Sequence, residues 1–213
     1  MDSQKKKVPA IVIKRLPRYY RYLSELRKQD IKRISSGALS EKMNVTASQI
    51  RQDFNYFGGF GQQGYGYSVD HLYQEIGNIL GLHDGYTTII VGAGHLGHAL
   101  ANHSAFEKRG FKLCAIFDRD TNIIGKVING VEVLPDSLME KYVTENNIDI
   151  AILALPKDAV QETANKLIDC GIKGLWNFSY AELKTKKSVA VENVHLTDSL
   201  MTLSYKIKQD SQT

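Results

Sequence analysis

The segment that most constrains the fold of this chain is a glycine-rich turn between a buried strand and a helix. Residues 87–91, Thr-Thr-Ile-Ile-Val, predict a short buried strand, and residues 92–97 then read Gly-Ala-Gly-His-Leu-Gly before a helical pattern at 99–108. In such a turn the first glycine allows a tight bend, the second lets the backbone approach a pyrophosphate, and the third lets the helix pack on the strand. The segment therefore predicts a phosphate-binding turn at the start of a helix.

An acidic residue follows at the place where such a turn needs one. The next expected strand, 112–117, ends at Asp118, which stands 21 residues after Gly97. A carboxylate there can accept hydrogen bonds from both ribose hydroxyls of an adenosine and repels a 2′-phosphate, so NAD(H) is favoured over NADP(H), although Arg119 weakens that preference. The predicted cofactor-binding residues are Gly92, Ala93, Gly94, His95, Leu96, Gly97, Asp118, Arg119 and Pro156.

Strands and helices continue to alternate after this unit. Further strands are expected at 131–134, 149–155 and 174–178, and helices at 135–146 and 158–170. Such alternation predicts a parallel, doubly wound sheet, so residues 84–194 are expected to form a Rossmann-like α/β domain.

Positive charge is concentrated in the first quarter of the chain. Residues 1–51 carry 13 Lys and Arg against 4 Asp and Glu, a net charge of +9, which leaves −5 for residues 52–213 of a chain whose net charge is +4. Such a segment indicates contact with nucleic acid or another anionic surface, although charge alone also fits a solvated helical face.

Helical patterns in this basic region predict a helix-turn-helix. An amphipathic helix is expected over 9–29, where Pro17 should kink the helix or mark the first turn of its main part. Ser35 or Ser36 can cap a second, short helix that ends near Met43. Two short helices joined by a tight turn are typical of DNA-binding domains when the second of them keeps a free polar face.

The next helix has both a buried and a polar face. Thr46 and Gln49 match a capping box, in which the Thr hydroxyl accepts from the amide of residue 49 and the Gln side chain reaches back. The glycine-rich segment 58–67, with alternating aromatic residues, follows and predicts the β-hairpin of a wing. Residues 1–81 are therefore expected to form an α+β winged-helix domain. A small helical domain with a glycine-rich linker is the alternative, but it does not explain the concentrated charge.

The residue types on these elements predict contacts with double-stranded DNA. Arg, Gln, Asn and Ser side chains hydrogen-bond base edges and phosphates. The predicted DNA-binding residues are Lys14, Arg15, Arg18, Ser48, Gln49, Arg51, Gln52, Asn55, Gln62, Gln63 and Tyr65.

The last segment, 195–213, is expected to be a helix with a narrow apolar seam. Apolar residues recur there at helical spacing: Leu196, Leu200, Leu203 and Ile207. Such a helix can pack on its own domain or reach into a partner. We interpret it as a dimerisation helix that is exchanged between two copies of the chain, because winged helices usually read two half-sites of an inverted repeat as dimers.

An NAD-dependent oxidoreductase and a regulator that binds coenzyme A or an adenine nucleotide are the alternatives. An oxidoreductase needs an acid or base near the nicotinamide, and only about 110 residues of the chain are α/β. The candidate acids or bases are His95, His98, His103 and His195, and none is paired with a carboxylate at a telling spacing. We therefore expect cofactor binding without turnover, and no catalytic residue.

Composition excludes other classes. With 43% hydrophobic and 23% charged residues the chain can bury a core, and no run approaches the roughly 20 apolar residues of a membrane-spanning helix. No apolar signal segment is evident, so a cytoplasmic protein is expected. Cys114 and Cys170 lie in apolar surroundings without metal-ligand spacing, so buried reduced thiols and no metal site are expected.

Short motifs spread over nearly the whole chain match one known family. They are the segments 13–17, 19–21, 34–36, 49–58, 64–67, 171–174, 177–178 and 191–194. Together they resemble the Rex family of bacterial redox-sensing transcriptional repressors. The resemblance implies a winged helix, a Rossmann domain that senses the NADH/NAD⁺ ratio, a domain-swapped C-terminal helix, and a homodimer that leaves its inverted-repeat operator when NADH binds.

The chain departs from the pattern of that family on its DNA-binding elements. Family members usually carry two adjacent basic residues before the Asp of the recognition helix, whereas this chain has Arg51-Gln52-Asp53. The family wing is usually basic between its glycines, and here it has Gln62-Gln63. Fewer cations should lower the electrostatic part of the DNA affinity and its dependence on salt.

Two further departures concern the switch that the resemblance implies. His103 stands where the family often has Tyr, and His195 stands where Asp usually follows the segment 191–194. In the family these two groups and an Arg matching Arg15 form a polar switch between the DNA-bound and NADH-bound dimers. Weaker coupling between ligand and DNA is therefore expected of Arg15, His103 and His195.

Overall fold

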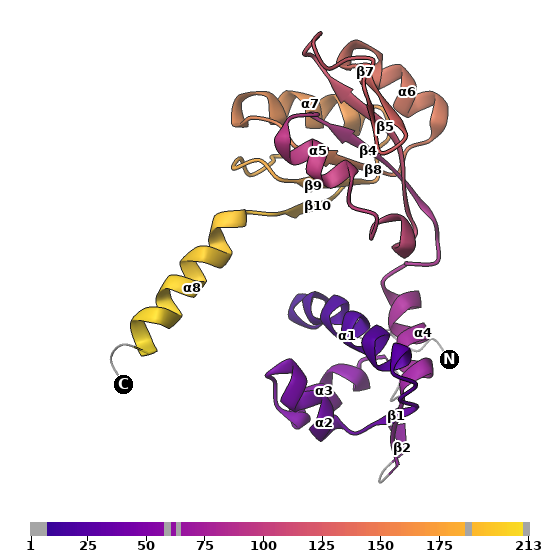
Figure 1. Ribbon diagram of the computed structural model, residues 1–213, viewed down its shortest axis with the longest axis vertical. Helices are drawn as coiled ribbons and strands as arrows, with labels where there is room; N and C mark the ends of the chain where they lie inside the picture. Colours follow the sequence, from indigo (N-terminus) through magenta and orange to yellow (C-terminus); the bar gives the residue numbers. More distant parts are fainter. Residues whose placement is uncertain (1–7, 58–60, 63–64, 186–188, 211–213) are drawn as a thin grey trace. The chain divides into compact units, whose positions relative to one another are not determined.

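The computed structural model describes residues 8–57, 61–62, 65–185 and 189–210, and the chain divides into two compact units (Figure 1). Unit 1 is Met1–His83 and unit 2 is Asp84–Thr213. Each unit buries a hydrophobic core of its own. In the described part of the chain no helix combines the length and the apolar composition that spanning a membrane requires.

Unit 1 is a winged helix, as the sequence predicts. Its helices pack around a core that includes Leu23, Ile50, Phe54 and Leu72, and its small antiparallel sheet has the strand order β1-β3-β2. The strand β1 extends the hairpin beyond the sequence prediction because it pairs with β3. The elements are α1 (Ala10–Lys28), β1 (Arg33–Ile34), α2 (Ser36–Met43), α3 (Ala47–Asn55), β2 (Gly61–Gln62), β3 (Gly66–Ser68) and α4 (Val69–Ile79).

The first helix continues through its proline. Pro17 lies in the middle of the 19-residue helix α1 and so does not mark a first turn. A proline inside a helix leaves the carbonyl four residues earlier without its usual donor, here that of Ile13. Both Pro17 and Ile13 are exposed, so water can satisfy that carbonyl.

Side-chain caps fix the two short helices of the helix-turn-helix. Ser35 Oγ accepts from the amide of Ala38 at 3.0 Å, and Thr46 Oγ1 accepts from the amide of Gln49 at 3.1 Å. Asn44 ends α2 in the left-handed region, at φ 50°. The second half of the predicted capping box is wrong: among the described residues the Gln49 side chain donates to Asp53 and does not reach back to the amide of Thr46.

Unit 2 is the predicted Rossmann-like α/β fold. Its sheet has the order β10-β9-β8-β4-β5-β7-β6, and every pair is parallel except β6 with β7. The strands are β4 (Tyr86–Val91), β5 (Phe111–Asp118), β6 (Val127–Ile128), β7 (Val131–Pro135), β8 (Ile150–Leu153), β9 (Gly174–Asn177) and β10 (Ala190–Asn193). The helical segments are α5 (His95–Ala101), η1 (Glu107–Arg109), η2 (Asp136–Leu138), α6 (Met139–Asn146), α7 (Lys157–Asp169) and α8 (Leu196–Asp210).

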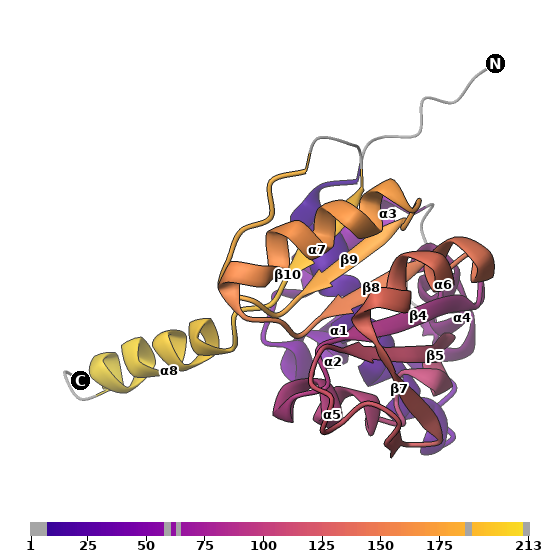
Figure 2. The same ribbon diagram turned by 90° about the horizontal axis from the view of Figure 1, so that it is seen from above.

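Helices cover both faces of this sheet. Ile89 and Val91 of β4 lie in one core with Val160 of α7, whereas Ile90 lies in a second core with Ala101 of α5. Successive strand residues point to opposite faces, so α6 and α7 cover one face and α5 covers the other (Figure 2). The sheet is therefore doubly wound. The carboxyl ends of its parallel strands form one edge of the sheet, which lies between the two layers of helices.

The helix predicted at 99–108 has different bounds. α5 begins within the glycine-rich segment, at His95, and ends at Ala101, and the short 3-10 turn η1 (Glu107–Arg109) lies further along the chain. Asn102 Nδ2 donates to the carbonyl oxygen of His98 at 2.9 Å and so caps the end of the helix.

Two glycines of the turn are required by close packing. A Cβ on Gly97 would overlap the carbonyl oxygen of Gly92, and Gly92 itself has φ +98°, where its own Cβ would press on Ala154. At Gly94, in contrast, an added Cβ meets nothing within 4 Å. Gly92 and Gly97 are thus required by the close packing of the turn, whereas Gly94 borders open space.

Gly97→Ala should destabilise unit 2 by about 3 kcal/mol, because its methyl group cannot be accommodated without moving the backbone of the turn. The matched control is Gly94→Ala, the same change in the same turn, which should leave the stability nearly unchanged. Urea unfolding followed by the fluorescence of Trp176, the single tryptophan of the chain, measures both. Equal stabilities for the two variants would contradict the packing role of Gly97.

Candidate functional site

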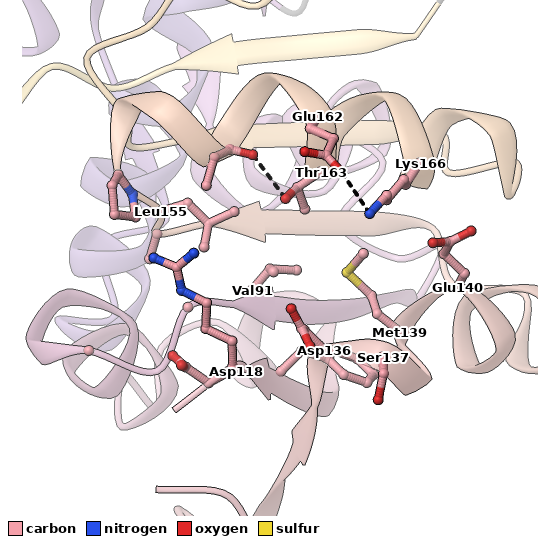
Figure 3. Close-up of a pocket in the computed structure, with 17 residues that line it drawn as sticks. Val91, Asp118, Asp136, Ser137, Met139, Glu140, Leu155, Glu162, Thr163 and Lys166 are labelled. Atoms are coloured by element: carbon pink, nitrogen blue, oxygen red, sulfur yellow. Dashed lines mark hydrogen bonds and ion pairs between the residues drawn. The ribbon is translucent and has the colours of Figure 1, made fainter. Parts of the chain in front are cut away.

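A cavity of about 650 Å³ opens at the carboxyl edge of the sheet in unit 2 (Figure 3). Residues at or after the ends of β4, β5, β7 and β8 line it, and so do residues of α6 and α7. Ligands of doubly wound folds bind at this edge, where the carboxyl ends of parallel strands meet. Five residues of the predicted cofactor set line the cavity: Gly92, Gly94, Asp118, Arg119 and Pro156.

The other four predicted cofactor residues lie beside the cavity in the same turn or helix. Ala93 and Gly97 are buried, Leu96 is half-buried, and His95 is exposed at the start of α5. None of these four residues is among those that line the cavity.

Asp118 connects the glycine turn to the end of β5. Its Oδ2 accepts from the amide of Ala93 at 2.6 Å, and its Oδ1 accepts from the amide of Asp120 at 2.9 Å. A carboxylate offers about four lone-pair sites, so each oxygen keeps capacity for one more donor. Because the residue lines the cavity, that capacity suits the hydroxyls of a ribose.

Charged residues that sequence reasoning missed extend the cavity between α6 and α7. Glu162 and Lys166 of α7 form an ion pair at 2.9 Å, and Thr163 donates to the carbonyl of Ala159 (Figure 3). With Asp118, Asp136, Glu140 and Glu162 against Arg119 and Lys166, the ionisable lining has a net charge of −2. The sequence signal was available for Asp136, which directly follows a strand at this edge.

The candidate histidines lie in aromatic or helical surroundings. The His103 ring meets the Phe106 ring edge-on at 4.7 Å, and the His195 ring stacks near Tyr180 at 6.2 Å. Among the described residues, none of His95, His98, His103 and His195 hydrogen-bonds a carboxylate.

In unit 1, helix α3 keeps a polar face exposed. Ile50 and Phe54 are buried, and Gln49 is half-buried at the start of the helix. Arg51 donates from Nη1 to Ser36 Oγ at 3.0 Å, so Ser36, the first residue of α2 and not its cap, holds the guanidinium. The exposed polar residues of the helix are Ser48, Arg51, Gln52 and Asn55.

Asp53 is the one acidic residue of this helix, and its side chain is 0% exposed. Arg15 of α1 binds it through two hydrogen bonds, Nε to Oδ2 at 2.7 Å and Nη2 to Oδ1 at 2.6 Å. Tyr19 donates to Oδ2 at 2.8 Å and Gln49 donates to Oδ1 at 2.9 Å. Arg15, predicted to touch DNA, is therefore a partner of Asp53 that ties α1 to α3.

Burial and hydrogen bonding act on the pKa of Asp53 in opposite directions. Burial disfavours the charged carboxylate, but the hydrogen bonds from Arg15, Gln49 and Tyr19 outweigh that cost and hold its pKa below the ordinary value. The pKa of Tyr19 is raised, first by burial and then by its bond to Asp53. The group is therefore a carboxylate at neutral pH.

The remaining predicted DNA-binding residues lie on α1 and on the wing. Lys14 and Arg18 are exposed on α1, and Tyr65 is 71% exposed at the start of the second wing strand. Gln62 lies in β2, where only its backbone is described, and Gln63 lies outside the described residues. Arg33 Nε donates to the carbonyl oxygen of Tyr65 at 2.9 Å, so β1 supports the wing.

Two family models match the chain. The model described as "Putative DNA-binding protein N-terminus" matches residues 7–55, and the model described as "CoA binding domain" matches residues 83–181. The two matches fall on unit 1 and unit 2 respectively.

Relatives over nearly the whole length carry one name. A curated protein of Thermoanaerobacter pseudethanolicus (strain ATCC 33223 / 39E), named redox-sensing transcriptional repressor Rex, is 56% identical over 208 residues, which are 98% of this chain and 93% of that protein. A crystal structure of RSP in complex with beta-NAD⁺ and operator DNA is 55% identical, with a TM-score of 0.90 over 96% of this chain and 94% of that one. A structure of RSP with beta-NADH is 52% identical, with a TM-score of 0.90 over 97% of each chain.

The hydrogen bonds to Asp53 should make unit 1 sensitive to acid. Because its folded pKa is lowered, unfolding takes up a proton, so the stabilisation is complete above the unfolded value near 3.9 and is lost as the pH falls through the folded pKa. Asp53→Asn should cost about 3 kcal/mol at neutral pH and should flatten the fall in stability between about pH 5 and pH 2.

Hydrogen exchange at the amides of Ile50 and Phe54, measured in the full chain at several pH values, reports this stability. Asp70→Asn is the control, because it removes an exposed ion pair with Arg27 by the same change. An unchanged pH profile in Asp53→Asn would contradict the assignment.

Proposed function

The chain belongs to the Rex family of redox-sensing transcriptional repressors, and from that premise we propose how its own residues carry out the repressor's two binding functions. Unit 1 binds an inverted-repeat operator in double-stranded DNA through α3 and the wing. Unit 2 binds NAD(H) in the cavity at the carboxyl edge of the sheet. Binding of NADH releases the operator.

The observation that carries the ligand assignment is the position of Asp118 between the glycine turn and the cavity. A dinucleotide laid over the turn brings its pyrophosphate past Gly94, where no Cβ fills the space. Its adenosine ribose then meets the free lone pairs of Asp118. When bound, the cofactor supplies only a signal, its redox state, since the relatives are named as repressors and not as enzymes.

Charge supports NAD(H) over nucleotides that carry an additional phosphate. The lining has a net charge of −2, and Asp118 itself stands where a 2′-phosphate would have to lie. The coenzyme A alternative has one specific observation in its favour, the description of the family model over residues 83–181. The 3′-phosphate of coenzyme A would meet the same acidic lining, and relatives above 50% identity hold NAD⁺ and NADH.

A homodimer is proposed from the C-terminal helix. The apolar seam of α8 is exposed in the described chain, at Leu196, Leu200, Leu203 and Ile207. Burial of this seam against a second copy would pair two winged helices, as an inverted repeat requires. Because DNA and NAD(H) are both cytoplasmic ligands in a bacterium, we also propose a cytoplasmic location.

The ligand assignment predicts the behaviour of Asp118→Ala. Loss of a charged acceptor for the ribose should weaken NADH binding on the order of 10- to 100-fold and should reduce the discrimination against NADPH. Asp120→Ala is the matched control, because it removes a neighbouring carboxylate that does not line the cavity.

Calorimetric titration of each form with NADH, NAD⁺, NADPH and coenzyme A gives the affinities, and gel shifts with each ligand give the effect on DNA binding. Tighter binding of coenzyme A than of NADH would favour the alternative nucleotide. Absence of any dinucleotide binding by the wild type would reject the sensor assignment.

The substituted switch predicts a weak response to NADH. A neutral imidazole at position 195 binds the guanidinium of Arg15 weakly, and a protonated imidazole repels that guanidinium. A carboxylate at the same position would pair with it. We expect NADH to release this protein from DNA incompletely. His195→Asp should strengthen the release.

Gel shifts of wild type and His195→Asp at one fixed pH, with and without saturating NADH, test this. The control is His98→Asp, a histidine of unit 2 that the switch does not include. Complete release of the wild-type protein by NADH would refute the hypothesis.

A further inference from the structure

Asp53 has no free capacity to accept another hydrogen bond. Each oxygen has two donors: Oδ1 accepts from Arg15 Nη2 and Gln49 Nε2, and Oδ2 accepts from Arg15 Nε and Tyr19. An ionised carboxylate is an acceptor with about four sites, so all of them are filled. The pKa of Asp53 is lowered, in keeping with a carboxylate held in its charged form.

Because the Asp53 carboxylate can only accept hydrogen bonds, it determines which end of the Gln49 amide faces it. An amide group has an NH₂ end and an oxygen end, and only the NH₂ end can bind an acceptor-only carboxylate. One hydrogen of Nε2 is used by Asp53, so the group retains one N–H and the oxygen Oε1. An amide carries one N–H on the side of its oxygen and one on the opposite side. When the opposite N–H binds Asp53, the N–H and the Oε1 that remain lie side by side, a donor next to an acceptor.

Gln49 stands at the end of α3 that reads bases in helix-turn-helix proteins. It is the third residue of the helix after the cap Thr46, and recognition helices contact base edges with their N-terminal residues. Its side chain is half-buried, whereas Asp53 beneath it is fully buried. Among the described residues Asp53 is the one side-chain partner of the Gln49 amide, so the rest of that amide is available to a ligand.

We propose that Gln49 reads an adenine in the major groove of each operator half-site, and that Asp53 is the positioning residue that presents its amide. The inference rests on the proposed function, that unit 1 binds an operator. Adenine presents an N6 donor beside an N7 acceptor in the major groove, the complement of the edge that Gln49 has free. Guanine presents two acceptors there, O6 and N7. One of them would face the acceptor Oε1, so no hydrogen bond could form between the two atoms.

Arg15 and Tyr19 complete the arrangement from α1. Arg15 neutralises the carboxylate, and the hydrogen bonds from both residues fix it, so Asp53 cannot rotate to follow Gln49. A side chain that is held before binding loses less conformational entropy when the complex forms. The base preference at this position thus depends on a residue that the DNA does not touch.

The test uses the full-length chain and a consensus duplex that the wild type selects from random DNA. Every symmetric pair of positions in this duplex is replaced in turn by the other base pairs, and affinities are measured by fluorescence anisotropy at fixed salt. One A·T pair per half-site should be preferred on the order of 5- to 150-fold. Gln49→Ala should abolish that preference and leave the preferences at the other positions unchanged.

Asp53→Asn should reduce the same preference although Gln49 is present. An Asn at 53 has one oxygen and one NH₂ group, so it can no longer fix which end of the Gln49 amide faces outward. In the double variant Asp53→Asn, Gln49→Ala, the change at 53 should have no further effect at that position, and this non-additivity is not expected of a merely structural role.

Asp70→Asn is the matched control, the same substitution in an ion pair with Arg27 elsewhere in unit 1, and it should keep all base preferences. Should Asp53→Asn not fold, Arg15→Met combined with Asp53→Asn removes both charges and leaves no unpaired buried charge.

Three results would overturn the inference. If Gln49→Ala keeps every base preference, Gln49 reads no base, and if the lost preference is for a base other than adenine, the presented edge is not the one assigned. A uniform loss of affinity in Asp53→Asn without a change in preference would make Asp53 only structural. Failure of the wild type to select any sequence would reject the proposed function as well, and so is distinct from these results.

Discussion

A carboxylate that leaves water must be given hydrogen-bond donors, and both binding sites of this protein are built around that requirement. Asp53 in unit 1 has side-chain donors from Arg15, Tyr19 and Gln49 at every lone pair. Asp118 in unit 2 has two backbone amides and keeps half of its capacity. The first carboxylate is closed to any further ligand, and the second is open to one.

This difference in saturation matches the difference in task. A helix that reads bases gains from a fixed orientation, because side chains held in place lose less entropy on binding. A site that responds to a ligand must instead keep acceptor capacity, and Asp118, which lines the cavity, can accept from a ribose hydroxyl without breaking its bond to Ala93. The glycine turn that supplies the Ala93 amide is held in place by the close contact between Gly92 and Gly97.

Most of the fold could be predicted because it depends on local patterns. The glycine turn, the alternation of strands and helices and the cap at Thr46 each involve residues close in sequence. The strands β6 and β10 depend on pairing with a neighbour and leave little pattern in two to four residues. The role of Asp53 could not be predicted in the same way, because it depends on Arg15, 38 residues earlier. The local sequence indicated only that Asp53 lies three residues after the buried Ile50.

The cost of moving Arg15 limits how this chain can couple its two ligands. If Arg15 left Asp53, a fully buried carboxylate would lose two of its four hydrogen bonds, and breaking a buried pair typically costs about 3–5 kcal/mol. An imidazole such as His195 cannot return that free energy, since it offers a guanidinium at best one neutral acceptor. Arg15 is therefore expected to stay with Asp53 in both the DNA-bound and the NADH-bound states. The coupling between NADH binding and DNA binding must then act by moving α1 and α3 together, because the ion pair between Arg15 and Asp53 joins the two helices.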